Sequence, residues 1–198
     1  MFNQYGMFPQ KQIQDIVRNN STIVKVNEGY NDEKRLSIMI TNSALNPNSS
    51  YHIHSLEYFR SGDMFSLEGE RYLCRVDTVL KRHAKYKATV DYCNYPFPLT
   101  KIERVKVGED ELGRPIYEDR EVFQKIEYGI LEEVKILKTD SNQPINNISV
   151  QYTFTIRDTQ LNREVFTLNR EFTIKGYKLK VTGWNYLRSG IMVVTLSR

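Results

Sequence analysis

Two histidines spaced two residues apart are the first residues in this chain whose types and positions could do chemistry. Side chains at i and i+2 of a strand point to the same face, so His52 and His54 would lie side by side. A zinc ion needs a third and usually a fourth ligand, which Cys74, Cys93, His83 or a carboxylate would have to supply. The sequence has neither a CxxC nor an HExxH motif. We therefore predict no metal or cofactor site and interpret both histidines as surface residues of a strand.

The residues needed for other common reactions are also poorly represented. With three histidines and no GxSxG motif, a Ser–His–acid triad would have to assemble from scattered positions. The sequence has no GxxxxGK[ST] phosphate-binding motif and no GxGxxG motif linked to a strand. Carboxylates are numerous, but the sequence does not give their separation in space, so an acid pair of the glycosidase type stays open. We predict that the protein is not an enzyme.

The placement of charged residues is more informative than their total. The net charge of +4 is too small to indicate a nucleic-acid-binding protein by itself. Residues 75–87 carry five basic residues against one aspartate, and these form a candidate basic patch: Arg75, Lys81, Arg82, Lys85 and Lys87. Residues 109–121 carry six acidic residues against two arginines. The candidate interface residues of this second segment are Glu109, Asp110, Glu111, Arg114, Glu118, Asp119 and Arg120.

These two charged segments allow three interpretations. They are two hairpins facing water, as charge runs usually are. Alternatively, the unlike segments of adjacent copies pair head to tail, which suits a cyclic ring better than a two-fold dimer. In the third interpretation the basic segment follows a nucleic-acid backbone with Tyr86 nearby. The alternation of a strand places Tyr86 and Lys85 on opposite faces, which weakens that third interpretation.

The composition is that of a soluble globular protein, with 40% hydrophobic and 26% charged residues. Tyrosine and phenylalanine make up most of the 12% aromatic residues, which favours sheet over helix. Two cysteines are too few for a small secreted domain held together by disulfides. No stretch has the roughly 18 apolar residues of a membrane span or the apolar core of a signal peptide. We expect a protein that stays in the cytoplasm, or in a particle assembled there, without a membrane partner.

The first twenty residues predict a short helical arm. Pro9 is compatible with a first helical turn, and Ile13, Ile16 and Val17 follow at the i, i+3, i+4 spacing of one helix face. A short helix with a narrow apolar stripe must pack on something larger, either its own domain or a neighbouring subunit. The candidate docking residues are Phe8, Ile13, Ile16 and Val17.

From residue 21 onward the apolar pattern has a period of two. Alternation of apolar and polar residues predicts antiparallel strands at residues 22–26, 36–40, 85–95 and 150–156. Gly69 and Gly176 each stand between two such runs and predict tight hairpins. We predict a mostly β fold, an antiparallel β-barrel or β-sandwich with one short N-terminal helix and a long protruding hairpin.

The segment around residues 96–100 is a candidate boundary. Pro96 and Pro98 are predicted to interrupt the sheet, because proline cannot donate a backbone hydrogen bond. A polar hairpin tip follows at residues 108–115. We therefore predict an arm at 1–20 and a β domain at 21–198. The β domain is either a single barrel with an inserted hairpin or two modules, 21–96 and 97–198.

Three stretches carry a further signal. The first begins at Gly62-Asp63-Met64-Phe65, continues through Gly69 and Tyr72-Leu73, and is followed by Tyr86-Lys87-Ala88 and Tyr92-Cys93-Asn94. The second is GEDELGRPI at residues 108–116, and the third is FTIKGYKLKV at 172–181, followed by Ser189-Gly190-Ile191. In this order they resemble the head–tail connector proteins of tailed bacteriophages. The second stretch is similar to a hairpin tip, D-x-x-G-x-P-I, of the head-closure (stopper) proteins in that family.

This resemblance implies a β-barrel or β-sandwich subunit that assembles as a ring below the portal of a virion. Such a ring passes DNA through its lumen without sequence-specific binding and helps to close the filled head. The implied partners are further copies of the chain, portal or adaptor proteins and tail proteins, and the implied location is the neck of the virion. The chain is longer than the simplest members, and its first twenty residues match none of them. A tail terminator and a distal tail protein therefore remain alternatives. An OB-like nucleic-acid-binding module is a separate alternative, because a five-strand barrel that binds single strands would resemble the basic half of the chain.

Overall fold

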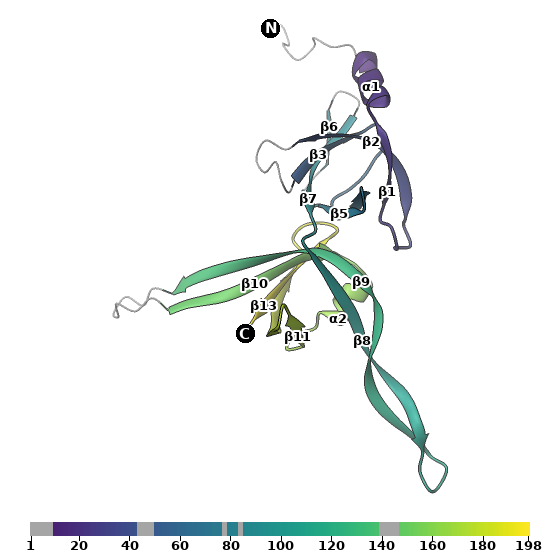
Figure 1. Ribbon diagram of the computed structural model, residues 1–198, viewed down its shortest axis with the longest axis vertical. Helices are drawn as coiled ribbons and strands as arrows, with labels where there is room; N and C mark the ends of the chain where they lie inside the picture. Colours follow the sequence, from purple (N-terminus) through teal and green to yellow (C-terminus); the bar gives the residue numbers. More distant parts are fainter. Residues whose placement is uncertain (1–9, 43–49, 77–78, 83–84, 139–146) are drawn as a thin grey trace.

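The computed structural model describes residues 10–42, 50–76, 79–82, 85–138 and 147–198 of the chain. Two β bodies lie one above the other along the long axis (Figure 1). The upper one contains α1 (Gln10–Asn19), β1 (Thr22–Val26), β2 (Lys34–Asn42), β3 (Ser50–Ser55), β4 (Met64–Leu67), β5 (Glu70–Cys74), β6 (Leu80–Arg82) and β7 (Lys85–Tyr92). The lower one contains β8 (Tyr95–Glu109), β9 (Pro115–Lys138), β10 (Asn147–Arg157), α2 (Gln160–Val165), β11 (Glu171–Ile174), β12 (Tyr177–Asn185) and β13 (Ile191–Ser197). The predicted mostly β fold with a short N-terminal helix is confirmed.

The upper body is a closed antiparallel barrel, which we call the barrel. Its strand order is β3-β2-β1-β4-β5-β7-β6, and β3 also pairs with β7, so the ring closes. Alternation along each strand sends one set of side chains inward. Val26, Ile38, Ile53, Phe65 and Val90 fill the interior and are almost fully buried. Closure leaves few free strand edges, so this body does not expose a long edge to unwanted pairing.

The lower body is an open six-stranded sheet in the order β11-β12-β13-β10-β9-β8, curved into what we call the half-barrel. Its core is built around the packed rings of Phe97, Phe154, Phe166 and Phe172. The helix α2 lies between the two edge strands and buries Val165 in this core. It begins at Thr159, whose hydroxyl accepts a hydrogen bond from the Asn162 amide and caps the helix. The sequence pattern did not indicate this second helix, because a single capped turn leaves no apolar period to read.

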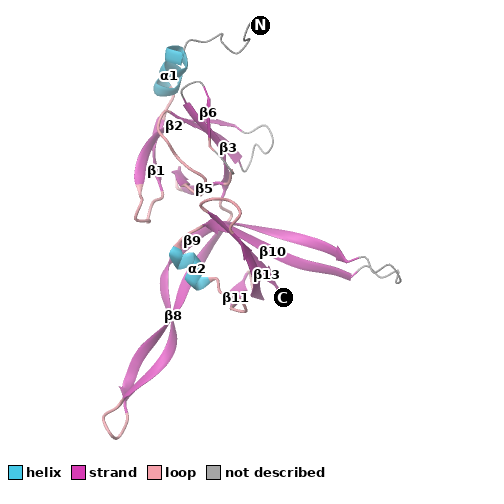
Figure 2. Cartoon of the chain, turned by 180° about the vertical axis from the view of Figure 1, so that it is seen from behind, coloured by secondary structure: helices cyan, strands magenta, loops and turns pink. Residues whose placement is uncertain are grey.

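Strand β9 changes partner halfway along its length. It pairs with β8 up to Gly129 and with β10 from Ile130 onward, so it is shared by two hairpins that project in different directions (Figure 2). A Cβ at Gly129 would lie 2.5 Å from Ile156 and 2.6 Å from Phe154, so only glycine lets these core side chains cross the strand here. We call residues 100–124 the β8–β9 arm. The long protruding hairpin expected from the sequence is this arm.

One prediction about the chain path was wrong. Pro96 and Pro98 do not interrupt the sheet: β8 runs through both, opposite Tyr128 and Ile126 of β9. The reason is that β8 is an edge strand. Residues two apart direct their backbone groups to the same edge, so both missing N–H groups can face the unpaired side without loss of a ladder hydrogen bond.

The contact between the barrel and the half-barrel, which we call the seam, combines apolar packing with a close backbone approach. Met64, Leu73, Cys93 and Ile130 form a small buried cluster there. Beside it, Gly62 of the barrel touches Gly190 of the half-barrel. A Cβ on Gly62 would lie 2.0 Å from the Gly190 carbonyl oxygen, so the backbones of the two bodies are in direct contact here.

Candidate functional site

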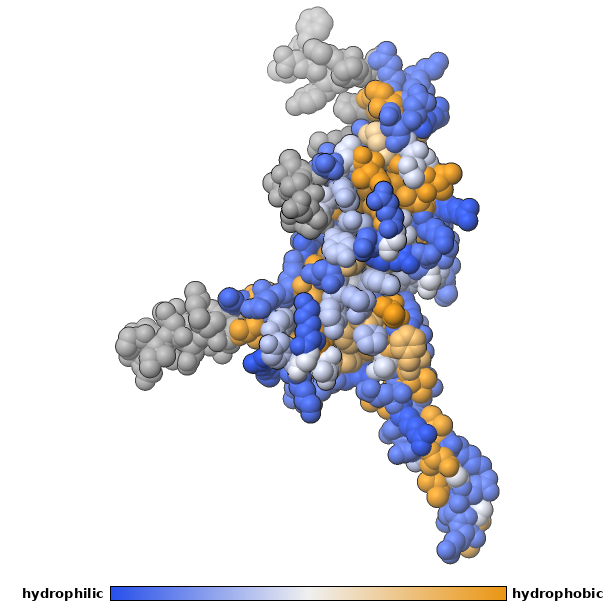
Figure 3. All heavy atoms as spheres, viewed as in Figure 1, coloured by the Kyte–Doolittle hydropathy of each residue, from blue (hydrophilic) through white to orange (hydrophobic). Residues whose placement is uncertain are grey.

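The β8–β9 arm carries an apolar stripe on one face. Directly opposed residues of antiparallel strands share a face, and the register pairs Thr100 with Phe123, Ile102 with Glu121 and Lys106 with Tyr117. Ile126, opposite Pro98, continues the same face toward the body. Three large apolar side chains therefore line up along the arm, and a fourth continues the line at its base; all are solvent-exposed: Ile102 (54%), Tyr117 (48%), Phe123 (58%) and Ile126 (48%). Figure 3 shows apolar residues running along the arm toward its tip.

This stripe is physically incomplete in a single copy of the chain. A two-stranded hairpin that projects from its domain is at best marginally stable in water. Burying a large apolar side chain stabilises a protein or a complex by about 1.5 to 3 kcal/mol. The arm thus gains stability when a partner covers its apolar face, which makes it the strongest candidate contact surface among the described residues.

The tip of the arm is a tight turn surrounded by charge. Asp110 accepts hydrogen bonds from the amides of Leu112 and Arg114 at 2.9 and 2.7 Å, and Gly113 adopts a φ of +73°. Leu112 is 76% exposed at the end of the turn. The structure places all the predicted interface residues of the acidic segment on this one arm, and all of them are exposed: Glu109, Asp110, Glu111, Arg114, Glu118, Asp119 and Arg120. Charged residues of the arm pair with near neighbours in the sequence, as in the Arg120–Glu118 ion pair at 2.8 Å.

The predicted basic patch is divided by the structure. Arg75 is engaged with Asp91 at 2.9 Å and with Glu132 of β9 at 3.2 Å, so it serves as an ion-pair bridge across the seam. Lys81 lies over the Tyr86 ring, and the side chain of Arg82 is outside the described part of the chain. Lys85 and Lys87 lie on the outer face of β7. The barrel and the arm tip are at opposite ends of the long axis (Figure 1), so an attraction between them acts between copies of the chain.

The predicted docking helix packs on its own barrel. Val17 of α1 is buried, and the helix contacts β2. Ile13 is half-buried, whereas Ile16 is 50% exposed and is available to another molecule. Phe8 lies outside the described residues. The helix therefore uses one part of its apolar stripe within the subunit and leaves another part free.

The histidine pair and the cysteines do not come together. His52 and His54 lie on the outer face of β3, whereas Cys74 and Cys93 are buried as free thiols. Burial raises the pKa of both cysteines to about 12, so they remain protonated core residues at neutral pH. The described residues contain no group of three or more His, Cys, Asp or Glu side chains arranged for a metal ion. One detail of our interpretation was wrong: His54 is only 7% exposed and is not a surface residue.

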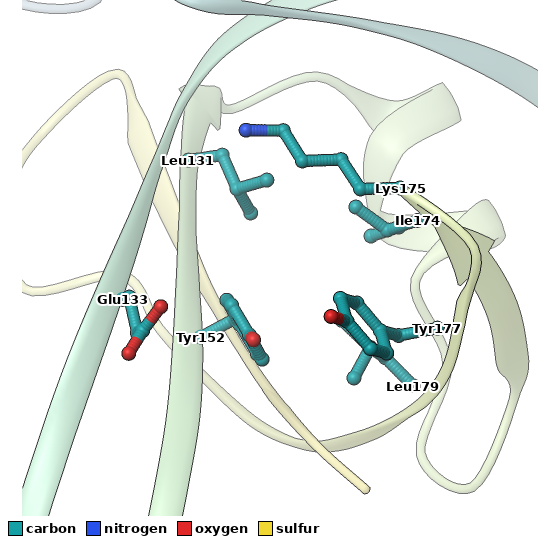
Figure 4. Close-up of a pocket in the computed structure, with 7 residues that line it drawn as sticks. All are labelled: Leu131, Glu133, Tyr152, Ile174, Lys175, Tyr177 and Leu179. Carbon is teal, nitrogen blue, oxygen red and sulfur yellow. The ribbon is translucent and has the colours of Figure 1, made fainter.

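A shallow pocket of about 240 Å³ opens at the end of the half-barrel (Figure 4). Leu131, Ile174 and Leu179 are its apolar residues, and Glu133, Lys175, Tyr152 and Tyr177 are its polar ones. No pattern in the sequence indicated this pocket. Its residues come from four strands and a hairpin turn, so no local motif marks it. The mixture of an apolar floor and a polar rim suits a side chain of a partner protein.

A polar network fixes the seam. Arg157 of the half-barrel donates to both carboxylate oxygens of Asp32 in the β1–β2 turn, with Nη1 2.8 Å from Oδ1. Tyr30 from the same turn lies between two cations, with its ring centroid 3.5 Å from Lys125 Nζ and 4.6 Å from the Arg157 guanidinium. The Tyr30 hydroxyl donates to Glu127, which is completely buried. These bidentate and cation–π contacts join the two bodies through side chains rather than through the linker alone.

Burial raises the pKa of Glu127, and the nearby Lys125 ammonium and Tyr30 hydroxyl only partly oppose that shift. A carboxyl group with a raised folded-state pKa stabilises the fold at low pH, and this contribution is lost as the pH rises through the folded pKa. We therefore expect Glu127→Gln to reduce the loss of stability between pH 5 and pH 8 and to raise the melting temperature at pH 8 by a few degrees. Thermal unfolding across this pH range checks it.

The matched control is Glu171→Gln on the exposed face of β11, which should leave the melting temperature unchanged at each pH. A Glu127→Gln protein that unfolds at a lower temperature than the parent at pH 8 would show that the ion pair with Lys125, 3.1 Å away, outweighs the burial cost.

Among the described residues, no helix has the length and apolar character to cross a membrane. Comparison of this chain with protein-family models, with curated proteins and with solved structures finds no match.

Proposed function

We propose that this chain is a structural subunit of the head–tail connector of a tailed bacteriophage, of the head-closure (stopper) type, and that it works by assembly and not by catalysis. The observation that carries the proposal is the β8–β9 arm. It extends well beyond the half-barrel and presents Ile102, Phe123 and Tyr117 to solvent along one face. A projecting arm with an uncovered apolar stripe is the kind of element that a subunit uses to hold a neighbour.

The geometry also favours a ring over a two-fold dimer. The arm tip is acidic and lies at one end of the molecule, whereas the barrel, with Lys85 and Lys87, lies at the other (Figure 1). Contacts between unlike ends are heterologous, and they close into a ring when the rotation between neighbours allows it. In this proposal the partners are other copies of the chain, portal or adaptor proteins on one side and tail proteins on the other. DNA passes through the lumen, and the subunit resides in the neck of the virion.

The seam supports this role because ion pairs and a close backbone contact join the two bodies. Bidentate pairing of Arg157 with Asp32 and the Gly62–Gly190 contact set the angle between barrel and arm. A subunit that must place an arm accurately on its neighbour benefits from such contacts, since free rotation at the seam would add an entropy cost to every contact in the ring.

A nucleic-acid-binding module is the second candidate. The closed barrel and the cationic outer face of β7 favour it, since small barrels are common scaffolds for oligonucleotide binding. A tail terminator or distal tail protein would use the same arms at another position in the particle.

Sedimentation velocity and negative-stain electron microscopy over a range of concentrations test the proposal, with and without portal particles from the same gene cluster. We expect either discrete ring-shaped oligomers or capture of the chain by the portal ring, together with weak DNA binding. A chain that stays monomeric, ignores portal particles and binds single-stranded DNA tightly with a steep salt dependence would be the binding module instead.

A further inference from the structure

The outer face of β3 and β7 brings two lysines and two histidines together. The register places His54 opposite Lys87 and His52 opposite Thr89, and alternation puts Lys85 on the same face. Burial and, after it, repulsion from Lys85 and Lys87 lower the pKa of His54 to about 4, so its ring is neutral at pH 7. Four nitrogen-bearing side chains thus share one small area of the barrel.

Among the described residues, this area has none of the acidic partners that cations elsewhere in the fold have. Partly buried cations in other parts of the fold are paired, for example Arg71 with Glu28 and Arg157 with Asp32. In contrast, Lys85 and Lys87 form no ion pair within the described structure, although Lys85 is half-buried. Unpaired, partly desolvated cations beside each other cost stability. Binding of an anion between these lysines would offset that cost.

Two threonine hydroxyls hold the histidines in place beside these lysines. His54 is 7% exposed, and its Nδ1 has no hydrogen-bond partner among the described residues. Its Nε2 lies 3.2 Å from the Thr41 hydroxyl, and His52 Nδ1 lies 3.1 Å from the Thr89 hydroxyl. The Nδ1 atom itself is buried, so the groups that this face offers to a ligand from solvent are the ammonium groups of Lys85 and Lys87, with the histidines packed behind them.

We propose that this face is a binding site for a phosphate-class oxyanion, with Lys85 and Lys87 as the charged ligands and His52 and His54 beside them. Ammonium groups and imidazole nitrogens are hydrogen-bond donors suited to phosphate oxygens. The same chemistry recognises a free phosphate ion and a phosphodiester of a nucleic-acid backbone. In the connector proposal the same lysines face the acidic arm tip of a neighbouring copy, so the anion site belongs to the unassembled chain and is tested there.

Fluorescence anisotropy with a labelled DNA duplex and thermal shift with inorganic phosphate test the site. We expect Lys85→Gln/Lys87→Gln to weaken duplex binding by about tenfold and to reduce the slope of log affinity against log salt by about 2. The matched control is Lys178→Gln/Lys180→Gln, which removes two exposed lysines at the same spacing from β12. It should change affinity by less than about twofold.

The melting temperature provides a second test of the site that does not require tight DNA binding. In phosphate-free buffer the Lys85→Gln/Lys87→Gln protein should melt at a higher temperature than the parent, because the repulsion is gone. The parent alone should then gain stability on addition of phosphate. Stabilisation by phosphate without duplex binding identifies the free ion as ligand and supports the site. Equal losses in both double variants, or no response to either probe, would overturn it.

Discussion

Replacing Gly62 by alanine should destabilise the protein more than any other single substitution that adds one methyl group. The new Cβ would lie 2.0 Å from the Gly190 carbonyl oxygen and 2.6 Å from its carbon, and the φ of +83° is itself unfavourable for alanine. Neither neighbour is a side chain that can rotate away. The barrel and half-barrel must separate at this point, and we expect a loss of about 4 kcal/mol or more in the free energy of unfolding.

The control for backbone conformation is Gly176→Ala. Gly176 has nearly the same φ, +82°, but its added Cβ would meet nothing within 4 Å. It should therefore show only the conformational cost of about 1 to 2 kcal/mol. Denaturant unfolding of both variants measures the difference. Similar losses for Gly62→Ala and Gly176→Ala would mean that the seam yields easily and that the two bodies are not held at a fixed distance.

The second large effect is expected in the arm. Ile102→Ser/Phe123→Ser removes two exposed apolar side chains from one face without touching the core. If each side chain contributes about 1.5 to 3 kcal/mol when a partner covers it, the association constant should fall by two orders of magnitude or more. The melting temperature of the isolated subunit should stay the same or rise. Sedimentation equilibrium and calorimetry measure these two quantities.

Glu103→Ser/Arg120→Ser is the matched control on the opposite face of the same arm, at a directly paired position. It tests whether any disturbance of the arm weakens association. Unchanged assembly of the Ile102→Ser/Phe123→Ser protein, together with a lower melting temperature, would show that the stripe stabilises the subunit itself and does not hold a neighbour.

Local patterning was enough to predict much of this fold. The hairpins at Gly69 and Gly176 followed from apolar–polar alternation around a glycine with positive φ. The arm tip followed from the turn residues between Glu109 and Pro115. These features depend on residues that are neighbours in the sequence, which is why the pattern alone could identify them.

The features that were missed depend on distant residues. Arg157 and Asp32 are 125 positions apart, and nothing near either residue indicates that they pair across the seam. The course of β8 through Pro96 and Pro98 depends on its being an edge strand, which is a property of the sheet and not of the segment. The apolar stripe also needed the register of β8 against β9, since Ile102 and Phe123 share a face only in that register.

The shared strand β9 makes the two projecting hairpins dependent on each other. One continuous run of 24 residues is paired with β8 in its first part and with β10 in its second. Inserting or deleting a single residue near Gly129 would turn every subsequent side chain to the other side. Such a change would reverse the faces of one hairpin while leaving those of the other hairpin unchanged. Variation in natural relatives should therefore be tolerated at the two hairpin ends and strongly restricted at the crossing point, so that the lengths of the hairpins vary while their relative orientation is inherited unchanged.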